Sequence, residues 1–342
     1  MLPKSQNQEH YILSSSPHAH AQSSVSGLML DVIIALLPAL CCSVYFFGCR
    51  ALLLAGTTIA ACLVTEALCR LAMKRNHTIG DLSAVLTGLL LALNLPPTLP
   101  LWMAATGGVF AIAVAKQVFG GLGYNPFNPA LAARAFMLVS FSEAMTCWSS
   151  SAWKVAAGGV DSTTTATPLS LLKSYATANW NQVPAADQVL NFANGSFIQS
   201  AFIGNINGSL GEVSALALLV GAVYLICRRV ITWHIPVAFL GTIVAFAFFA
   251  YGMNLNALKL AEVHVFCGGA IIGACFMATD YVTSPITSKG KLVFGCGCGL
   301  LTMLIRLYGS FPEGVSFAIL IMNAFTPLIS RFTQPKVFGA TK

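Results

Sequence analysis

Among the ionisable side chains within or beside the long apolar segments of this 342-residue chain, four most need explaining: Asp31, Glu66, Arg134 and Asp280. A charged group inside a bilayer is costly unless it faces a cavity or a partner, so each is a candidate for ion transport or ligand binding. Arg134 is expected to pair with an acid or with an anionic ligand. The three carboxylates could serve an ion pathway, although Asp31 lies near enough to a segment start to sit simply at the membrane interface.

Four asparagines lie at the proline- and glycine-rich breaks between apolar segments: Asn94, Asn125, Asn128 and Asn323. Their amides could ligate an ion or hold a ring system by hydrogen bonds. They could equally hold neighbouring helices together, which is a common role of amide side chains in membranes. The sequence leaves these three roles open.

Hydroxyl side chains gather at the midpoint of the chain, in VDSTTTATPL (160–169). Four consecutive hydroxyl residues run from Ser162 to Thr165, and Thr167 precedes a proline, which restricts its backbone to extended angles. Composition alone makes this stretch a solvated linker.

Other familiar chemistry is missing from the sequence. It contains no catalytic triad, Walker loop, strand-associated GxGxxG or metal-spaced histidine cluster. Most of the 11 cysteines lie in apolar runs, where cysteine behaves as a small hydrophobe. Cys296 and Cys298 have the wrong spacing for a CxxC site. We therefore expect no metal site.

Composition places the chain in a membrane. Hydrophobic residues make up 56% of it, charged residues 8%, and the mean hydropathy is +0.77. Apolar runs near the roughly 20 residues that cross a bilayer recur throughout, and lipid leaves no partner for free backbone groups, so the spans must be helices. The net charge of +7 is scattered over the span ends without a basic stripe, which argues against nucleic acid. The sequence predicts an all-α polytopic membrane protein.

Apolar runs, read against Gly, Pro and Asn punctuation, predict ten helices. The predicted spans are 27–48, 51–70, 81–95, 101–118, 128–147, 210–227, 233–252, 262–278, 292–307 and 315–332. The runs 81–95 and 262–278 are short and end in proline-containing polar segments, which is typical of broken helices around a buried site. The polar residues 1–25 lack a cleavage pattern and read as a retained tail.

An internal repeat follows from the register of two segments. FGGLGYNPFNPALAARAF (119–136) aligns with YGSFPEGVSFAILIMNAF (308–325) at an offset of 189, and the same offset pairs Pro96 with Pro285. Because each repeat has an odd number of spans, five, the second repeat must enter the membrane in the opposite orientation to the first. The predicted segments are a tail (1–25), a first five-helix repeat (26–147), a loop (148–209), a second repeat (210–332) and a tail (333–342).

Positive charge predicts the orientation. Of the 18 lysines and arginines, twelve fall in segments on the side of the amino terminus, five fall on the other side, and Arg134 lies within a span. Cytoplasmic segments carry the excess of positive charge. Both termini are therefore expected in the cytoplasm, and the loop 148–209 on the outer face.

Four ordered blocks carry a resemblance to a known family. DSTTTATPL resembles the D-x-x-[ST]-x-A-T signature at which a bacterial flavin transferase attaches FMN to threonine. The other blocks are GGLGYNPFNPALAARAF (120–136), FMATDYVTSPITSKGK (276–291) and RLYGSFPEGVSFAILIMNAFTPLI (306–329). The chain is similar to the integral membrane flavoprotein subunits of ion-translocating electron transport complexes, which include the D-type subunits of Rnf complexes and the B-type subunits of the sodium-pumping NADH:quinone reductase. The length and short tail look more like the former. Two positions depart from the pattern: Thr165 replaces a glycine and Tyr281 a proline.

The resemblance implies a cofactor and partners. Thr167 would carry FMN through its phosphate, with Asp161, Thr164 and Ala166 as the remaining signature positions. It further implies a second, non-covalent flavin, riboflavin, between the helices, for which Asn125, Asn128 and Arg134 are candidate contacts. The chain would be one member of a six-subunit complex in the bacterial inner membrane, matured by a flavin transferase and coupling electron transfer to Na⁺ or H⁺ transport.

Two other functions fit parts of the sequence. Inverted repeats with broken helices also occur in channels and carriers for small solutes or ions, which need no redox cofactor. A scaffold protein without its own cofactor is the third possibility. Covalently bound flavin distinguishes the first function from the other two.

Overall fold

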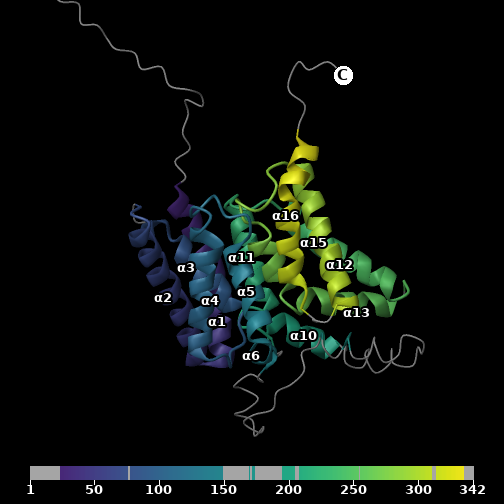
Figure 1. Cartoon of the computed structure of the whole chain (residues 1–342). Helices are drawn as coiled ribbons and strands as arrows, with labels where there is room; N and C mark the ends of the chain where they lie inside the picture. The colour runs from purple at the N-terminus through teal and green to yellow at the C-terminus, as the bar shows by residue number, and fades with distance from the viewer. Residues whose placement is uncertain are drawn as a thin grey trace, which may run out of the picture.

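The computed structural model describes residues 24–75, 78–148, 169, 172–173, 195–204, 208–253, 255–309 and 313–334. All regular elements in these ranges are helical, and they pack side by side as one bundle (Figure 1). The signature residues Asp161, Thr164, Ala166 and Thr167 lie outside the described residues.

Within the described ranges, four helices are long and apolar enough to cross a membrane. They are α1 (Val25–Phe47), α2 (Cys49–Ala72), α15 (Ser288–Tyr308) and α16 (Val315–Thr333). Side-chain caps begin two of them: Ser24 Oγ accepts from Gly27 N at 3.1 Å in α1, and Thr287 Oγ1 accepts from Gly290 N at 3.1 Å in α15. Such caps satisfy amides that the first helical turn leaves free.

Five further apolar helical segments of the described residues are shorter than these four. These are α3 (Ser83–Leu93), α4 (Leu101–Ile112) with its π-helical continuation η2 (Ala113–Gln117), α5 (Pro129–Ser140), α11 (Ala215–Cys227) and α12 (His234–Ala250). Three small elements connect or flank them: η1 (Ile79–Asp81), α6 (Ser142–Thr146) and α10 (Gly195–Ile203). The predicted span 128–147 is thus two helices, because the backbone leaves helical geometry at Phe141 (φ −129°, ψ 47°).

The predicted span 262–278 is also broken, in its middle and not only at its end. Helix α13 (Leu255–Phe266) is followed by α14 (Ala270–Ile272) and the π-helical η3 (Gly273–Met277), with a bend of 66° between the two parts. Gly268 and Gly269 have φ of 72° and 66°, left-handed angles that glycine adopts without strain. The bend therefore lies at this glycine pair.

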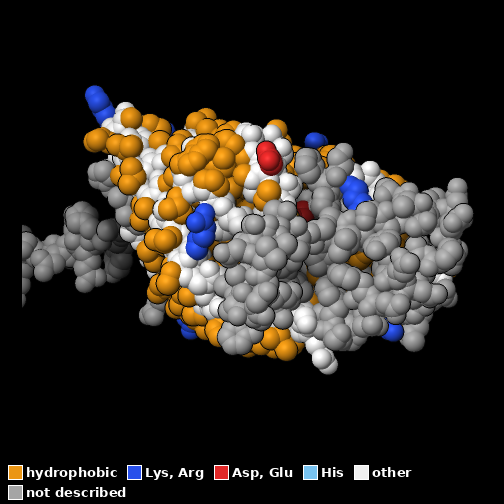
Figure 2. Space-filling view, turned by 90° about the horizontal axis from the view of Figure 1, so that it is seen from below, with side chains coloured by type: hydrophobic (Ala, Val, Ile, Leu, Met, Phe, Trp, Pro, Cys, Tyr) orange, Lys and Arg blue, Asp and Glu red, His pale blue; other side chains and the backbone are white. Residues whose placement is uncertain are grey.

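These ten apolar segments follow the predicted order, and the chain is an all-α polytopic membrane protein. Large apolar side chains are exposed on its outer helices, among them Leu53 and Leu71 of α2 and Phe332 of α16. Figure 2, which views the bundle from the loop end, shows apolar side chains around the rim of the described residues, with few charged ones between them. A surface of this kind is stable against lipid tails and not against water.

The two halves of the bundle pair their helices in the same way. Helix α2 packs mainly on α3 and α4, as α12 packs on α13 and α15, and α5 follows α4 as α16 follows α15. The first helices of the halves, α1 and α11, contact each other, and so do the last, α5 and α16. At the α1–α11 crossing a Cβ on Gly221 would overlap the Ala35 carbonyl oxygen, so only glycine fits. A duplicated unit accounts for this pairing.

The ends of the bundle differ in what they carry. Figure 1 shows the start of α1 and the end of α16 at one end, whereas α6 and α10 lie at the other. Helix α6 directly precedes the predicted loop 148–209 and α10 belongs to it. We call these the terminal end and the loop end.

Candidate functional site

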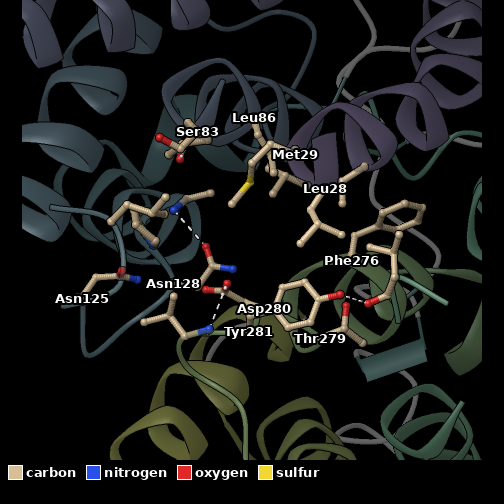
Figure 3. Close-up of a pocket in the computed structure, with 18 of the residues that line it drawn as sticks. Leu28, Met29, Ser83, Leu86, Asn125, Asn128, Phe276, Thr279, Asp280 and Tyr281 are labelled. Carbon is tan, nitrogen blue, oxygen red and sulfur yellow. Dashed lines mark hydrogen bonds between the residues drawn. The ribbon is translucent and has the colours of Figure 1, made fainter. Parts of the chain in front are cut away.

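A cavity of about 830 Å³ lies between the two halves at the terminal end. Its walls come from the starts of α1 and α3, the connection from η2 to α5, the end of α11 and the residues after η3. Most of its surface is apolar, from side chains such as Leu28, Met29, Leu86, Leu90 and Phe276 (Figure 3). A largely apolar concave site with a few polar groups is typical of small-molecule and cofactor sites.

Two of the predicted asparagines lie in this cavity. Asn128 is the N-cap of α5: its Oδ1 accepts from Ala130 N at 3.1 Å, while its Nδ2 donates to the Met277 carbonyl at 3.2 Å. Asn125 donates to the Phe127 carbonyl at 2.9 Å. Both residues are buried, with exposures of 4% and 5%. Asn128 thus links the first half to η3 of the second at the cavity wall.

Asp280 lines the same cavity from the second half, next to Asn128 in Figure 3. Its carboxylate accepts from Val282 N at 3.4 Å and from Thr283 Oγ1 at 3.3 Å. The ion pairs of the described residues do not include it. Among the described residues, the hydrogen bonds that Asp280 accepts thus come from neutral groups.

A π-helical segment from each half borders the cavity. Lys116 belongs to η2 and Phe276 to η3, and both line the wall. Single π turns inside α-helices cost hydrogen-bond geometry and are frequent at functional sites. Here they turn a side chain from each half toward the shared space.

Glu66 and Lys116 form a buried ion pair at 2.8 Å, with side-chain exposures of 1% and 2%. Lys116 also donates to Ser83 Oγ at 2.8 Å, and Gln117 Nε2 donates to Glu66 at 3.0 Å. The second carboxylate oxygen of Glu66 has no hydrogen-bond partner within the described residues. The count of charges by side assigns Lys116, near the end of the predicted span 101–118, to the side of the amino terminus; in the structure η2 carries it into the interior of the bundle.

Arg134 lies between the halves and pairs with an acid, one of the two outcomes expected of it. Its Nη2 is 2.5 Å from Glu313 and 4.0 Å from Glu212, and its Nη1 donates to Asn94 at 3.1 Å. Arg134 does not line the cavity. Glu212 and Glu313 have no distinguishing sequence pattern beyond being acids just before apolar helices, so the sequence does not predict their role.

The remaining asparagines join helices. Asn94 donates to the Leu90 carbonyl at 2.7 Å and lies 3.6 Å from Met277 Sδ. The Asn323 amide nitrogen donates to the Ile319 carbonyl at 3.2 Å. The Asn323 amide oxygen accepts from the backbone N–H of Asn128 at 3.3 Å. These two side chains therefore hold the halves together, while Asn125 and Asn128 face the cavity.

Asp31 lies outside the cavity, at the contact between α1 and α11. It accepts from Tyr224 Oη at 3.0 Å and is 3.3 Å from the guanidinium of Arg228. The Arg228 side chain is 59% exposed, which makes this a partly solvated pair. The structure thus places Asp31 at a helix contact near the terminal end.

Three described residues follow the signature motif. Leu169 and Leu172 are buried, and Lys173 donates a hydrogen bond to the Gly309 carbonyl at the end of α15. Burial lowers the pKa of the Lys173 amine. The chain after the motif is therefore attached to the second half of the bundle.

The cysteines form no site. All 11 are free, with Cys296 exposed and Cys298 buried on α15. Among the described residues, no group of three or more His, Cys, Asp or Glu side chains is placed to bind a metal ion.

Comparison with known proteins covers nearly the whole chain. A model of the NQR2, RnfD, RnfE family matches residues 12–339. The chain is 46% identical over 336 residues to the D-type subunit of the Na(+)-translocating ferredoxin:NAD(+) oxidoreductase complex of Acetobacterium woodii, covering 98% of each chain. It is 45% identical over 333 residues to the D-type subunit of the proton-translocating ferredoxin:NAD(+) oxidoreductase complex of Clostridium ljungdahlii, covering 97% of each. The corresponding protein of the ion-translocating oxidoreductase complex of Escherichia coli K12 is 34% identical over 358 residues, covering 96% of this chain and 99% of the relative. The chain belongs to the NQR2, RnfD, RnfE family.

Proposed function

We propose that this protein is the D-type membrane subunit of an Rnf complex, which couples electron transfer between ferredoxin and NAD⁺ to ion transport. The observation that carries this proposal is the 46% identity over 98% of both chains to a protein of that type. Two of the similar relatives are named for different ions, Na⁺ and protons. We place the chain in the cytoplasmic membrane of a bacterium, embedded in lipid among the other five subunits.

Thr167 is the FMN attachment point in this proposal. The signature is complete at Asp161, Thr164, Ala166 and Thr167. A phosphoester between the threonine oxygen and FMN tethers the cofactor permanently, and a flavin transferase forms it. A small residue before Thr167 would leave room for the modification, and a proline after it disfavours helical backbone angles at Thr167.

The cavity at the terminal end is the proposed site of the second flavin, riboflavin. Its walls are mostly apolar, and Asn125, Asn128 and Asp280 supply polar groups among them. A flavin supplies electron transfer when bound, whereas this chain sets its position and surroundings. Asn128 and Asn125 would hold the ring edge, and the apolar side chains would exclude water.

The two proposed flavin sites lie toward opposite ends of the bundle. The cavity is at the end that carries the start of α1, and the residues after Thr167 attach near α10 and α13. With both termini in the cytoplasm, the cavity faces inward and the FMN loop faces the periplasm. Such an arrangement suits a protein that passes electrons across the membrane.

An ion pathway in this chain would use the buried carboxylates. Asp280 and Glu66 are the strongest candidates. Glu66 keeps a buried carboxylate oxygen without a hydrogen-bond partner among the described residues, and Asp280 lines the cavity outside the ion pairs of those residues. Asp31 is the third, at the contact between α1 and α11. Charged groups at such positions are typical of ion and proton routes.

The competing function is a channel or carrier without a cofactor, which the cavity between two similar halves and the break at Gly268 and Gly269 favour. In-gel flavin fluorescence of the denatured chain decides between the two. Protein made together with a flavin transferase should give a fluorescent band that is lost in Thr167→Ala and kept in Thr164→Ser. A dark wild-type band under these conditions would leave only the carrier or scaffold function.

A further inference from the structure

A second pocket, of about 680 Å³, opens at the surface of the terminal end, beside the large cavity. It lies between the turn from α11 to α12 and the residues that connect η3 to α15. The start of α15 is fixed at this end, because Thr287 Oγ1 and Thr333 Oγ1, at the end of α16, are 2.8 Å apart. As far as the structure describes it, the lining includes two basic side chains, Arg229 and Lys291, and no Asp or Glu.

The positive charge of this pocket is not compensated by an acid within the described residues. Their ion pairs include neither Arg229 nor Lys291, whereas the neighbouring Arg228 has an acidic partner. The sequence offers no nearby carboxylate either, because residues 213–261 and 281–312 contain no Asp or Glu. A ligand with a negative charge would therefore complement the pocket.

Both basic residues occupy positions that local structure disfavours. Arg229 follows α11 with a left-handed φ of 56°, and its N–H donates to the Ile226 carbonyl at 3.0 Å. Glycine usually takes this position after a helix, because other side chains strain it. Lys291 lies near the start of α15, where a positive charge opposes the helix dipole, and its Nζ donates to Thr232 Oγ1 at 3.3 Å. Helix stability alone does not explain either residue.

The rim of the pocket is apolar. Ile286, which lines it, is 88% exposed, and Trp233, at the start of α12, is 53% exposed. Tryptophan is enriched where the membrane meets water, at the level of the lipid headgroups. Val237 and Val293 continue the exposed apolar surface along α12 and α15. Positive charge and exposed apolar side chains thus follow each other in the order that a lipid headgroup and its acyl chains require.

We propose that Arg229 and Lys291 bind the phosphate of an anionic phospholipid, whose acyl chains lie along the outer faces of α12 and α15. Basic pockets between membrane helices are typical sites for anionic lipid headgroups. The guanidinium of Arg229 offers a planar pair of donors to phosphate oxygens, and the ammonium of Lys291 adds a point charge. The exposed Ile286 would then contact lipid and not water.

The lipid would also cover part of the wall of the large cavity. Four residues line both spaces: Val230, Ile231, Thr279 and Tyr281. Tyr281 Oη donates to the Val230 carbonyl, which ties the two segments of this wall together (Figure 3). A ligand that binds the folded chain raises its stability. Binding of the lipid should therefore raise the unfolding temperature.

The test uses the full-length chain in detergent, titrated with phosphatidylglycerol. Native mass spectrometry measures bound lipid, and thermal unfolding measures stabilisation. The variants are Arg229→Gln, Lys291→Gln and the two combined. Lys74→Gln is the matched control, because Lys74 is an exposed basic residue that also follows a helix, α2, with a left-handed φ of 52°. Phosphatidylcholine and inorganic phosphate are the comparison ligands.

We expect phosphatidylglycerol to bind the double variant at least tenfold more weakly than wild type, each single variant at least threefold more weakly, and the control within twofold of wild type. Phosphatidylcholine should bind wild type at least tenfold more weakly. Unchanged binding in the variants would overturn the proposal, and the single variants decide if the double variant does not fold. Equal binding of phosphatidylcholine, or equal stabilisation by inorganic phosphate, would overturn it as well, in favour of an uncharged groove or a site for a soluble anion.

A protein partner at the same surface is distinguished in the assembled complex. Ile286→p-benzoylphenylalanine places a photoreactive group at the rim of the pocket. Irradiation of the purified complex should attach a phospholipid to this chain, and the intact mass identifies it. Cross-linking to another subunit in place of lipid would overturn the proposal in favour of a protein interface. Non-covalent flavin should stay at the wild-type level in Arg229→Gln; its loss without loss of lipid would assign the pocket to the ligand of the large cavity.

Discussion

Lys116 and Glu66 form an ion pair 2.8 Å apart in the interior of the bundle, where α2 meets the π-helical η2. Their side chains are only 2% and 1% exposed, so neither charge is solvated. The pair borders the cavity that we propose for the second flavin, because Lys116 also lines its wall. Its contribution to stability and to function can be separated by mutation.

Removing one member of this pair should destabilise the protein more than removing both. Lys116→Met leaves the Glu66 carboxylate buried without its counter-charge, at a cost of about 3–5 kcal/mol. Glu66→Met/Lys116→Met should recover part of that loss. Thermal unfolding of the purified chain in detergent, monitored by size-exclusion chromatography, ranks the stabilities of the single and double variants. Lys74→Met, at an exposed lysine, is the control; a double variant less stable than either single one would contradict the account.

Arg134 should resist replacement even by lysine. Its two terminal nitrogens serve different partners, Asn94 and Glu313, and an ammonium group cannot reproduce this planar fork. We expect Arg134→Lys to lower the unfolding temperature and Arg134→Ala to lower it further. A double-mutant cycle with Glu313→Gln should give a coupling of about 0.5–3 kcal/mol. The exposed Arg331→Ala serves as control, and additive effects of Arg134 and Glu313 would show that their contact is unimportant.

Substitutions that remove the Asn128 amide should reduce the amount of non-covalent flavin bound to the protein. Asn128→Asp keeps an oxygen to cap α5 but removes the donor to Met277, whereas Asn128→Ala removes both and also costs about 1 kcal/mol of helix capping. Acid extraction and chromatography should show reduced riboflavin in both variants, with the covalent flavin unchanged. Thr106→Ala, an exposed hydroxyl on α4, should retain it. Full riboflavin occupancy in both Asn128 variants would place the flavin elsewhere.

Neutralising Asp280 or Asp31 should reduce ion transport more than electron transfer in the assembled complex. Asp280→Asn removes a carboxylate at the cavity, and Asp31→Asn removes the partner of Arg228 at the α1–α11 contact. Ion uptake into proteoliposomes and ferredoxin-dependent NAD⁺ reduction are measured on the same preparation. Glu262→Gln, an exposed acid on α13, should change neither. If both rates and their ion dependence stay at wild-type values, these acids are not in the pathway.

Sequence reasoning predicted the apolar segments well and the polar contacts between them poorly. Hydropathy is a local property, so all ten segments could be found without knowing their neighbours. The bend at Gly268 could not, because it depends on Arg306, a residue 38 positions later that binds the freed carbonyls. The contact of Glu313 with Arg134 could not be predicted either, because Glu313 has no distinguishing sequence pattern and Arg134 lies in the other half. The sequence also does not distinguish a lysine at the membrane surface from a buried lysine such as Lys116, which pairs with Glu66 inside the bundle.

The cavity was predictable only in part. Two asparagines in the NPFNP segment indicate a polar site, and the structure brings Asn125 and Asn128 to one wall with Asp280. The sequence left open whether these amides hold a ligand or join helices. In the structure, Asn94 and Asn323 join helices. Asn128 caps α5 and also lines the cavity. That distinction needed the packing of the two halves.

The proposed function depends most on the attachment of FMN to the hydroxyl oxygen of Thr167. Intact mass spectrometry of the isolated chain, made together with a flavin transferase, tests it most directly. We predict a mass that exceeds the polypeptide by one FMN less one water, with the excess absent in Thr167→Ala and present in Ser162→Ala. An unmodified wild-type mass, or an adduct that persists in Thr167→Ala, would contradict it.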